Sequence, residues 1–159
     1  MGDGADTHHG TAIAVGPAAA LILGGSGSGK SDLALRCITT APTGLIPEPA
    51  VLVADDRVHI AKRGNGLAVW APDTLIGKLE VRGLGIVPVP FSQWADLVLA
   101  VELTTIGAIE RMPDPPDRWE LHGVHVPLIK LNPFEASSAA KLLLALTLAA
   151  RGTGTPWGQ

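Results

Sequence analysis

Two apolar runs lie near the start of the chain, separated by a short turn. Thr11–Val15 (TAIAV) and Ala18–Leu23 (AAALIL) have the length of strands, and Gly16-Pro17 between them is typical of a turn. Continuous apolar runs of this length occur in sheets that are covered on both faces. We therefore predict two buried strands, followed by a glycine-rich loop.

Helical spacing begins directly after that loop. Leu33, Ala34, Cys37 and Ile38 recur as on one face of a helix, which predicts a helix over Lys30–Ile38. Further strands are expected over Val51–Ala54, Leu97–Leu103 and Val124–Leu131, and a hairpin over Val58–Ala61 and Leu67–Trp70.

The last helix is expected over Pro133–Ala150, a stretch rich in Ala and Leu. Asn132 would cap it, and Glu135, three residues later, would complete a capping box. With two main helices among many strands, the pattern predicts an α/β fold with one domain. We expect a flexible tail over residues 1–8, the folded domain over residues 9–151 and a second tail over residues 152–159.

Composition narrows the class of protein. Of the 159 residues, 47% are hydrophobic and 17% charged, as in a globular domain, and the net charge of −3 gives no electrostatic footprint for nucleic acid. The single cysteine, Cys37, excludes an internal disulfide and fits a reducing, cytoplasmic setting. Each apolar run is shorter than the roughly 18–20 residues that cross a bilayer. We therefore expect neither a membrane nor a nucleic-acid partner.

The glycine-rich loop carries the strongest functional signal. Gly24-x-x-x-x-Gly29-Lys30-Ser31 matches the P-loop pattern in full. Glycines let successive backbone N–H groups point into one concavity, Lys30 supplies a point charge for phosphates, and the Ser31 hydroxyl can bind Mg²⁺. A flexible linker is the alternative, but the apolar strand before the loop and the helix after it argue against one. The sequence thus predicts nucleotide binding by Gly24, Gly25, Ser26, Gly27, Ser28, Gly29, Lys30 and Ser31.

Acidic residues follow a second apolar strand, where P-loop enzymes often place an acid beside Mg²⁺. Asp55 and Asp56 end the run VLVADD, and in an extended chain they would point to opposite sides. One carboxylate would then face the metal and the other a substrate hydroxyl, whose proton it would take. The alternative is an ordinary turn.

Three further positions are candidates with ordinary alternatives. Glu80 is a possible metal ligand or a partner in a surface ion pair with Arg82. Arg111 would either steady charge on a transferred phosphoryl group or be a solvated surface residue. His9, beside His8, would act near phosphates or belong to the tail.

Several motifs follow one another along the chain. They are His9-Gly10, GGSGSGKS (Gly24–Ser31), VADDRV (Val53–Val58), LEVRGLGI (Leu79–Ile86), VELTTIGAIERM (Val101–Met112) and HGVHVP (His122–Pro127). Together they resemble the catalytic domain of HPr kinase/phosphorylase. The stretch LEVRGLGI is the most distinctive of them.

This resemblance implies an ATP- and Mg²⁺-dependent protein-serine kinase that phosphorylates HPr, the phosphocarrier of the sugar phosphotransferase system, and that can also remove the phosphate by phosphorolysis. It implies a P-loop fold with a small central sheet, related to phosphoenolpyruvate carboxykinases, and a homo-oligomer, a hexamer. The resemblance further assigns Ser31 and Glu80 as Mg²⁺ ligands, Asp56 as the group that takes the seryl proton, and His9, Lys30 and Arg111 as further catalytic residues. It also places Arg82, Gly83 and Gly85 in a stretch tied to dephosphorylation. Asp55, the other carboxylate of the pair, stays a metal-ligand candidate from its place after the apolar strand.

The chain also departs from the family pattern. We expect a short form without the N-terminal domain of the long members, with an extended loop at residues 39–50 and a different segment after RGLGI. The stretch Leu131–Ser138 lacks the arginines that the family has there, and lost arginines weaken phosphate binding. We therefore predict weak or absent phosphorylase activity. Two other functions stay open: a kinase of another protein or of a small hydroxyl compound, and a non-enzymatic nucleotide sensor.

Overall fold

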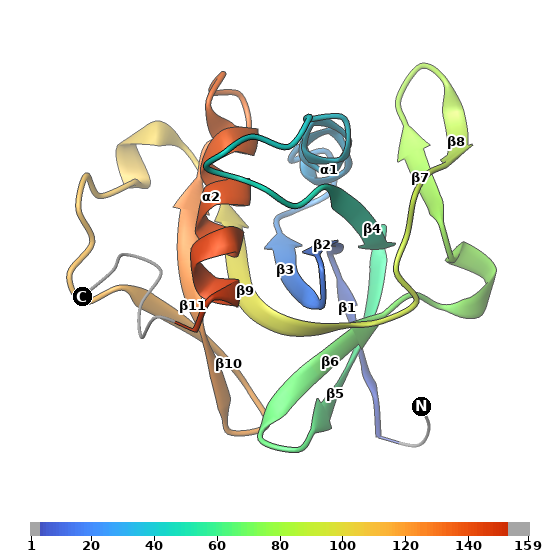
Figure 1. Cartoon of the computed structure of the whole chain (residues 1–159), viewed down its shortest axis with the longest axis horizontal. Helices are drawn as coiled ribbons and strands as arrows, with labels where there is room; N and C mark the ends of the chain where they lie inside the picture. The colour runs from blue at the N-terminus through green and yellow to red at the C-terminus, as the bar shows by residue number, and fades with distance from the viewer. Residues whose placement is uncertain (1–3, 153–159) are drawn as a thin grey trace.

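The computed structural model describes residues 4–152, which form a curled sheet with two helices packed on one side of it (Figure 1). The helices are α1 (Lys30–Ile38) and α2 (Ser138–Ala150). The strands are β1 (Asp6–His9), β2 (Thr11–Val15), β3 (Ala18–Leu23), β4 (Ala50–Ala54), β5 (Arg57–Arg63), β6 (Gly66–Trp70), β7 (Lys78–Val81), β8 (Gly85–Pro88), β9 (Ala95–Leu103), β10 (Asp117–Leu121) and β11 (Val124–Leu131). Two short 3-10 helices are η1 (Asp73–Leu75) and η2 (Ile106–Ala108).

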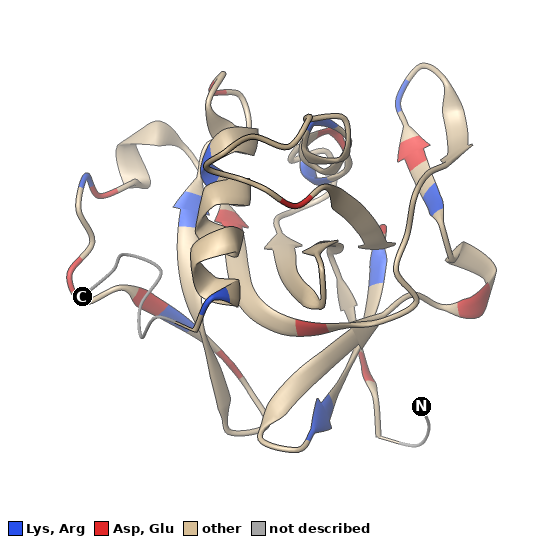
Figure 2. Ribbon diagram, in the orientation of Figure 1, with Lys and Arg blue, Asp and Glu red and all other residues tan. Residues whose placement is uncertain are grey.

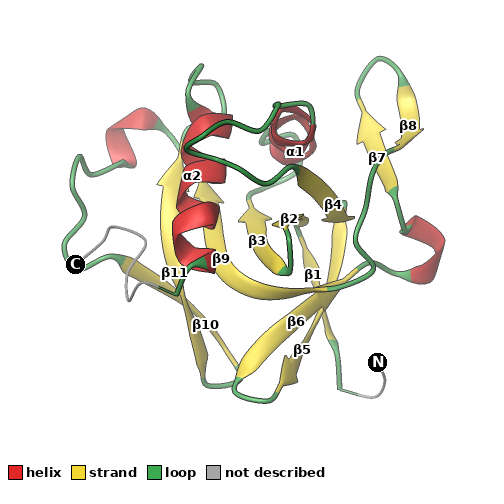
Figure 3. Ribbon diagram, viewed as in Figure 1, coloured by secondary structure: helices red, strands yellow, loops and turns green. Residues whose placement is uncertain are grey.

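Strand direction fixes where a ligand can bind. The main sheet has the order β1-β5-β6-β9-β3-β2-β4, with β11 also paired to β9 and β10 paired to β11. Because β3 and β11 both run parallel to β9, the carboxyl ends of these three strands lie at one edge. Ligands of open α/β sheets bind outside that edge. The β7–β8 hairpin forms a sheet of its own; it follows the short helix η1, and β7 contacts α1 (Figure 3).

Both faces of the central strands are buried, which explains their continuous apolar sequence. Ile13 of β2 and Ile22 of β3 pack in a core that also holds residues of α1 and α2. The alternate residues, such as Ala12 and Leu21, belong to a second core inside the curl of the sheet with residues of β5 and β6. β2 and β3 therefore each contribute to two cores. Neither strand has a solvated face, so both consist almost entirely of apolar residues.

Most predicted elements are confirmed. The strands at Thr11–Val15 and Ala18–Leu23, the helix at Lys30–Ile38 and the strand at Val124–Leu131 have the expected bounds. The flexible tail over residues 1–8 is wrong at residues 6–8, which pair antiparallel with β5 as part of β1. The remaining tail positions 1–3 and 153–159 lie outside the described residues.

The last helix begins five residues later than its sequence predicts, at Ser138. Asn132 does not cap it; the Asn132 side-chain oxygen accepts a hydrogen bond from the Phe134 backbone N–H at 2.9 Å. The Ser138 hydroxyl hydrogen-bonds the carbonyls of Asn132 and Glu135, and the Glu135 carboxylate pairs with Lys141 at 3.4 Å. The capping box is therefore wrong, because local turns satisfy these polar groups before the helix starts.

Candidate active site

The loop after β3 is shaped to receive an anion. Gly27 and Gly29 have φ angles of 75° and 101°, in the left-handed region that favours glycine. Among the described residues, the backbone N–H groups of Ser26, Gly27 and Gly29 have no acceptor, while Ser28 N–H donates to the Gly25 carbonyl at 3.1 Å. Since α1 begins at Lys30, its positive dipole end faces the same space. The donors of this loop fit the phosphates of a nucleotide.

Lys30 lies inside the loop. Its ammonium group donates to the carbonyls of Gly24 and Gly25 at 2.8 and 2.9 Å. Burial lowers the pKa of Lys30, and the charges of Asp56 and Asp55 oppose that shift by favouring the ammonium form. Lys30 is thus held at the base of the loop with two carboxylates near it.

Asp55 connects three elements from a buried position. Its side chain accepts hydrogen bonds from the hydroxyls of Thr11 and Ser31 at 2.9 and 2.7 Å, and from the Glu80 backbone N–H at 3.0 Å. Because the Ser31 hydroxyl gives its proton to Asp55, the lone pairs of that oxygen are left for a cation. Asp55 is 5% exposed and lies behind Ser31, so its part in metal binding would run through Ser31.

Asp56 points the other way. The backbone turns at this residue, whose φ of 68° is left-handed, and its carbonyl accepts the Gly10 N–H at 3.1 Å. The exposed Asp56 carboxylate lies 3.3 Å from the imidazole Nδ1 of His9. The two adjacent carboxylates diverge as the sequence predicts, although through a turn after β4 and not along a strand.

One cleft of about 580 Å³ brings most of these groups together. We call it the loop cleft; it is lined by His9, Thr11, Ser26, Gly27, Gly29, Lys30, Ser31, Asp32, Leu35, Asp56, Glu80, Val81, Arg82, Pro133 and Phe134. Five separate segments of the chain supply these residues. His9, Lys30, Ser31, Asp56, Glu80 and Arg82 therefore meet in one place, as the sequence predicts.

Gly83 and Gly85 do not line the loop cleft. Gly83 lies in the turn between β7 and β8, and Gly85 is the first residue of β8; their φ angles of 92° and 97° are left-handed. They shape the hairpin on which Glu80 and Arg82 are carried, so their contribution to the site is conformational.

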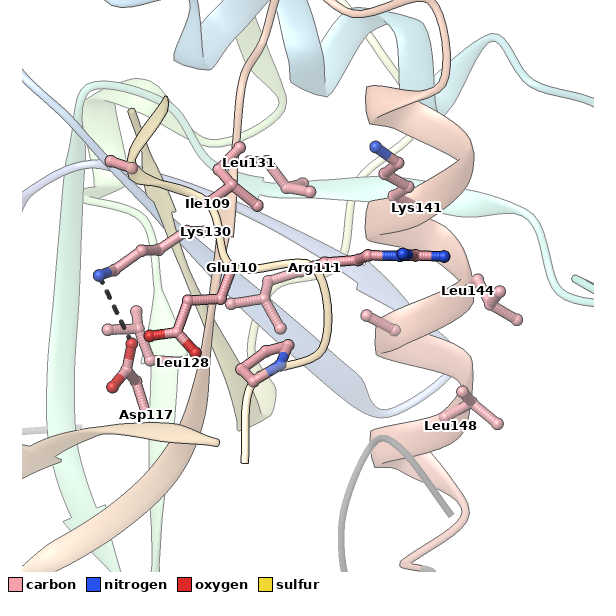
Figure 4. A pocket seen from close by; sticks show the side chains of 14 residues that line it. Ile109, Glu110, Arg111, Asp117, Leu128, Lys130, Leu131, Lys141, Leu144 and Leu148 are labelled. Atoms are coloured by element: carbon pink, nitrogen blue, oxygen red, sulfur yellow. Dashed lines mark ion pairs between the residues drawn. The ribbon is translucent and has the colours of Figure 1, made fainter. Parts of the chain in front are cut away.

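Arg111 lies elsewhere. It lines a second cavity of about 350 Å³ between α2, β11 and the segment after η2, together with Lys130 and Lys141. We call this the Arg111 cavity. Figure 4 shows Arg111 extended toward α2, between Lys141 and Leu144, and Glu110 turned toward the ion pair of Lys130 and Asp117. The structure does not bring Arg111 to the loop cleft.

Sequence reasoning missed six members of the cleft: Thr11, Asp32, Leu35, Val81, Pro133 and Phe134. Thr11 is fully buried and donates to Asp55; a lone hydroxyl at the start of an apolar strand was the available signal. Pro133 and Phe134 lie in the stretch expected to be helix, which hid their position at the cleft.

The site fits ATP with Mg²⁺. Ser31 supplies a hydroxyl oxygen, and Glu80 and Asp56 supply carboxylates that face the cleft. Within residues 4–152, no group of three His, Cys, Asp or Glu side chains is arranged to hold a metal by itself. Mg²⁺ is commonly bound by one or two protein oxygens together with substrate phosphates, which matches this donor set.

Charges of both signs surround α1 (Figure 2). Asp32 and Arg36 form an i,i+4 ion pair at 3.0 Å, and the Arg36 guanidinium also donates to the Pro133 carbonyl at 2.5 Å. Arg36 therefore anchors the loop after β11 to α1. No helix in the described part of the chain has the length and hydropathy to cross a membrane.

Comparison with known proteins shows the family of this chain. The model of the HPr serine kinase C-terminal domain family matches residues 4–152. The chain belongs to this family. A protein named HPr kinase/phosphorylase from Caldicellulosiruptor bescii is 34% identical over 134 residues, which cover 77% of this chain and 40% of that protein. Another of that name from Chlorobium limicola is 31% identical over 153 residues, 89% of this chain and 44% of that protein.

These relatives are longer than the HPr serine kinase C-terminal domain described here, which spans less than half of their length. A solved structure, the Hpr(Ser) kinase/phosphatase from Coxiella burnetii, has a TM-score of 0.76 and 21% identity to this chain. The match covers 94% of this chain and 99% of that one. It confirms the predicted α/β fold.

Proposed function

We propose that this domain transfers the γ-phosphoryl group of ATP to a serine hydroxyl of HPr with the help of Mg²⁺. The observation that carries the proposal is the meeting of Lys30, Ser31 and Asp56 in one cleft. The phosphate loop supplies donors for the nucleotide, and Asp56 supplies an exposed carboxylate for the acceptor.

Each residue has a defined part in the transfer. Backbone N–H groups of the loop and the Lys30 ammonium hold the phosphates and offset negative charge. Ser31 and Glu80 would hold Mg²⁺, which would supply positive charge for the phosphoryl oxygens. The Asp56 carboxylate accepts the serine proton as the new O–P bond forms and the bond between the β- and γ-phosphates breaks, leaving ADP.

His9 orients Asp56 in this proposal. Its Nδ1 lies 3.3 Å from the Asp56 carboxylate, on the first strand of the sheet. Buried Asp55 in turn orients Ser31 through their hydrogen bond at 2.7 Å. In this proposal Asp56 faces the acceptor, and Asp55 orients the Ser31 hydroxyl that binds the metal.

HPr is the proposed acceptor because the chain belongs to the HPr serine kinase C-terminal domain family. The test incubates the protein with Mg²⁺, HPr and ATP labelled at the γ-phosphate, and maps the labelled residue by mass spectrometry. Label on one serine of HPr supports the proposal. No label on HPr, in a parallel assay where a cell extract added in place of HPr becomes labelled, would move the function to the alternative acceptor.

The reverse reaction is proposed to be weak or absent. Phosphorolysis binds inorganic phosphate beside an anionic site, which requires cations. The stretch Leu131–Ser138 brings Pro133 and Phe134 to the cleft in place of arginine, and Arg36 is bonded to Pro133 and Asp32. Incubation of serine-phosphorylated HPr with phosphate should release little pyrophosphate. Release at a rate near that of the forward reaction would contradict this part of the proposal.

A further inference from the structure

We infer that Phe134 is the platform on which the base of the bound nucleotide stacks. This inference rests on the proposed binding of ATP. Phe134 is 83% exposed, yet it lines the loop cleft beside the phosphate-binding residues. A phenyl ring held open to solvent at the rim of a polar cleft offers a flat apolar face to a ligand, and bases stack on such faces.

Chain topology puts the ring next to the phosphate loop. β3 leads into the loop and β11 leads into the turn that carries Phe134; both run parallel to β9 and end at the same edge of the sheet. A Cβ placed on Gly29 would lie 3.2 Å from Cβ of Pro133, so the two loops are in contact. A nucleotide whose phosphates bind the first loop therefore has the second loop within reach of its base.

Hydrogen bonds anchor the backbone that carries Phe134. Phe134 N–H donates to the Asn132 side chain at 2.9 Å, and Arg36 of α1 donates to the Pro133 carbonyl at 2.5 Å. The buried Ser138 hydroxyl bonds the carbonyls of Asn132 and Glu135 on the other side of the turn. These bonds fix the backbone on both sides of Phe134 before the ligand arrives, which reduces the ordering cost of binding.

Leu35 of α1 also lines the cleft and extends its apolar rim. The contact is a stacking surface with no base-specific hydrogen bond among the groups named here. A ligand with a base should therefore bind more tightly than one without, and different purine nucleotides should bind with similar affinity.

The test measures binding of two ligands, ATP and inorganic tripolyphosphate, to the wild-type protein and to Phe134→Ala by calorimetry in the presence of Mg²⁺. Loss of one aromatic stack should weaken ATP binding by about 5- to 150-fold. Binding of tripolyphosphate, which has no base, should not change. Phe134→Trp should retain ATP binding, because the indole ring stacks equally well.

Met112→Ala is the matched control, because Met112 is also 83% exposed and lies outside the loop cleft. It should change neither affinity. Equal ATP affinity in wild type and Phe134→Ala would overturn the inference, as would an equal loss of both ligands, which would make Phe134 a support for the loop. A wild-type protein that binds neither ligand would instead contradict the proposed function.

Discussion

The loop cleft and the Arg111 cavity are both hollow and both carry charged residues, but their charges are organised differently. In the loop cleft, buried Asp55 links Thr11, Ser31 and the hairpin that carries Glu80. In the Arg111 cavity, Lys130 pairs with Asp117 at 3.6 Å and Lys141 with Glu135 at 3.4 Å, as separate surface pairs. Surface pairs of this kind contribute about 0–1 kcal/mol each.

The two regions therefore differ in how firmly their charged side chains are oriented. The loop cleft has a buried acceptor that fixes the orientation of groups facing the ligand. The Arg111 cavity has an apolar lining from Leu128, Leu144 and Leu148 with charges at its rim (Figure 4). We therefore place the proposed reactive centre at the connected polar network of the loop cleft, and not in the Arg111 cavity.

The largest expected effect comes from the lysines of the two regions. Lys30→Ala should lower kcat for HPr phosphorylation by about 10²–10³-fold, because it removes a preorganised charge at the transferred phosphate. Lys141→Ala, in the Arg111 cavity, should leave kcat within twofold. Steady-state kinetics with ATP and HPr measure both, and comparable losses in the two variants would remove the distinction between the regions.

Aspartates give the next comparison. The two carboxylate oxygens of Asp55 together accept three hydrogen bonds, and Asp55→Asn replaces one of these oxygens by a donor. The change should lower the free energy of unfolding by about 1–3 kcal/mol. Asp117→Asn, which breaks one surface ion pair, should cost about 0–1 kcal/mol. Urea unfolding reports both values. A larger cost for Asp117→Asn would show that the buried network is not what stabilises the edge of the sheet.

Arginines sharpen the contrast further. Arg82 lines the loop cleft from an exposed position, so Arg82→Ala should weaken ATP binding by about two- to fivefold. Arg111→Ala should leave ATP affinity unchanged. Calorimetry distinguishes the two, and the reverse ranking would mean that Arg111 reaches the nucleotide, as the family resemblance implies.

A further effect, confined to alkaline pH, concerns Cys37, which is buried where α1 packs near α2. Burial raises the pKa of its thiol to about 12 from 9.0, despite the nearby charge of Arg36. Above pH 9 the unfolded thiol ionises and the folded one does not, so stability should fall as the pH rises, by about 1.4 kcal/mol per pH unit. Cys37→Ala should show a shallower decline between pH 9 and 10, and equal slopes would contradict the shifted pKa.

The sequence predicts those parts of the molecule in which local pattern and tertiary burial agree. Thr11–Val15 and Ala18–Leu23 are apolar because both faces of each strand are covered. The loop of Gly24–Ser31 is predictable because its conformation requires glycine at defined places. The approach of Asp56 to this loop follows from the ends of buried strands meeting at one edge.

Other features depend on contacts between distant segments, which a local pattern does not contain. Strand Asp6–His9 is polar and exists because its backbone pairs with Arg57–Ile60. The turn before α2 is stabilised partly by the hydrogen bond from Arg36, which is distant in sequence, to the Pro133 carbonyl. The location of Arg111 is likewise set by the packing of its segment against α2, and no spacing along the chain encodes it.

The central claim is that Asp56 takes the proton of the acceptor serine while the loop holds ATP. The most direct measurement compares wild type with Asp56→Asn, an isosteric change that removes the base and tolerates the left-handed backbone. Transfer of the γ-phosphoryl group to HPr should fall by about 10²–10⁴-fold, with ATP affinity retained. Transfer at the wild-type rate in Asp56→Asn would contradict the account.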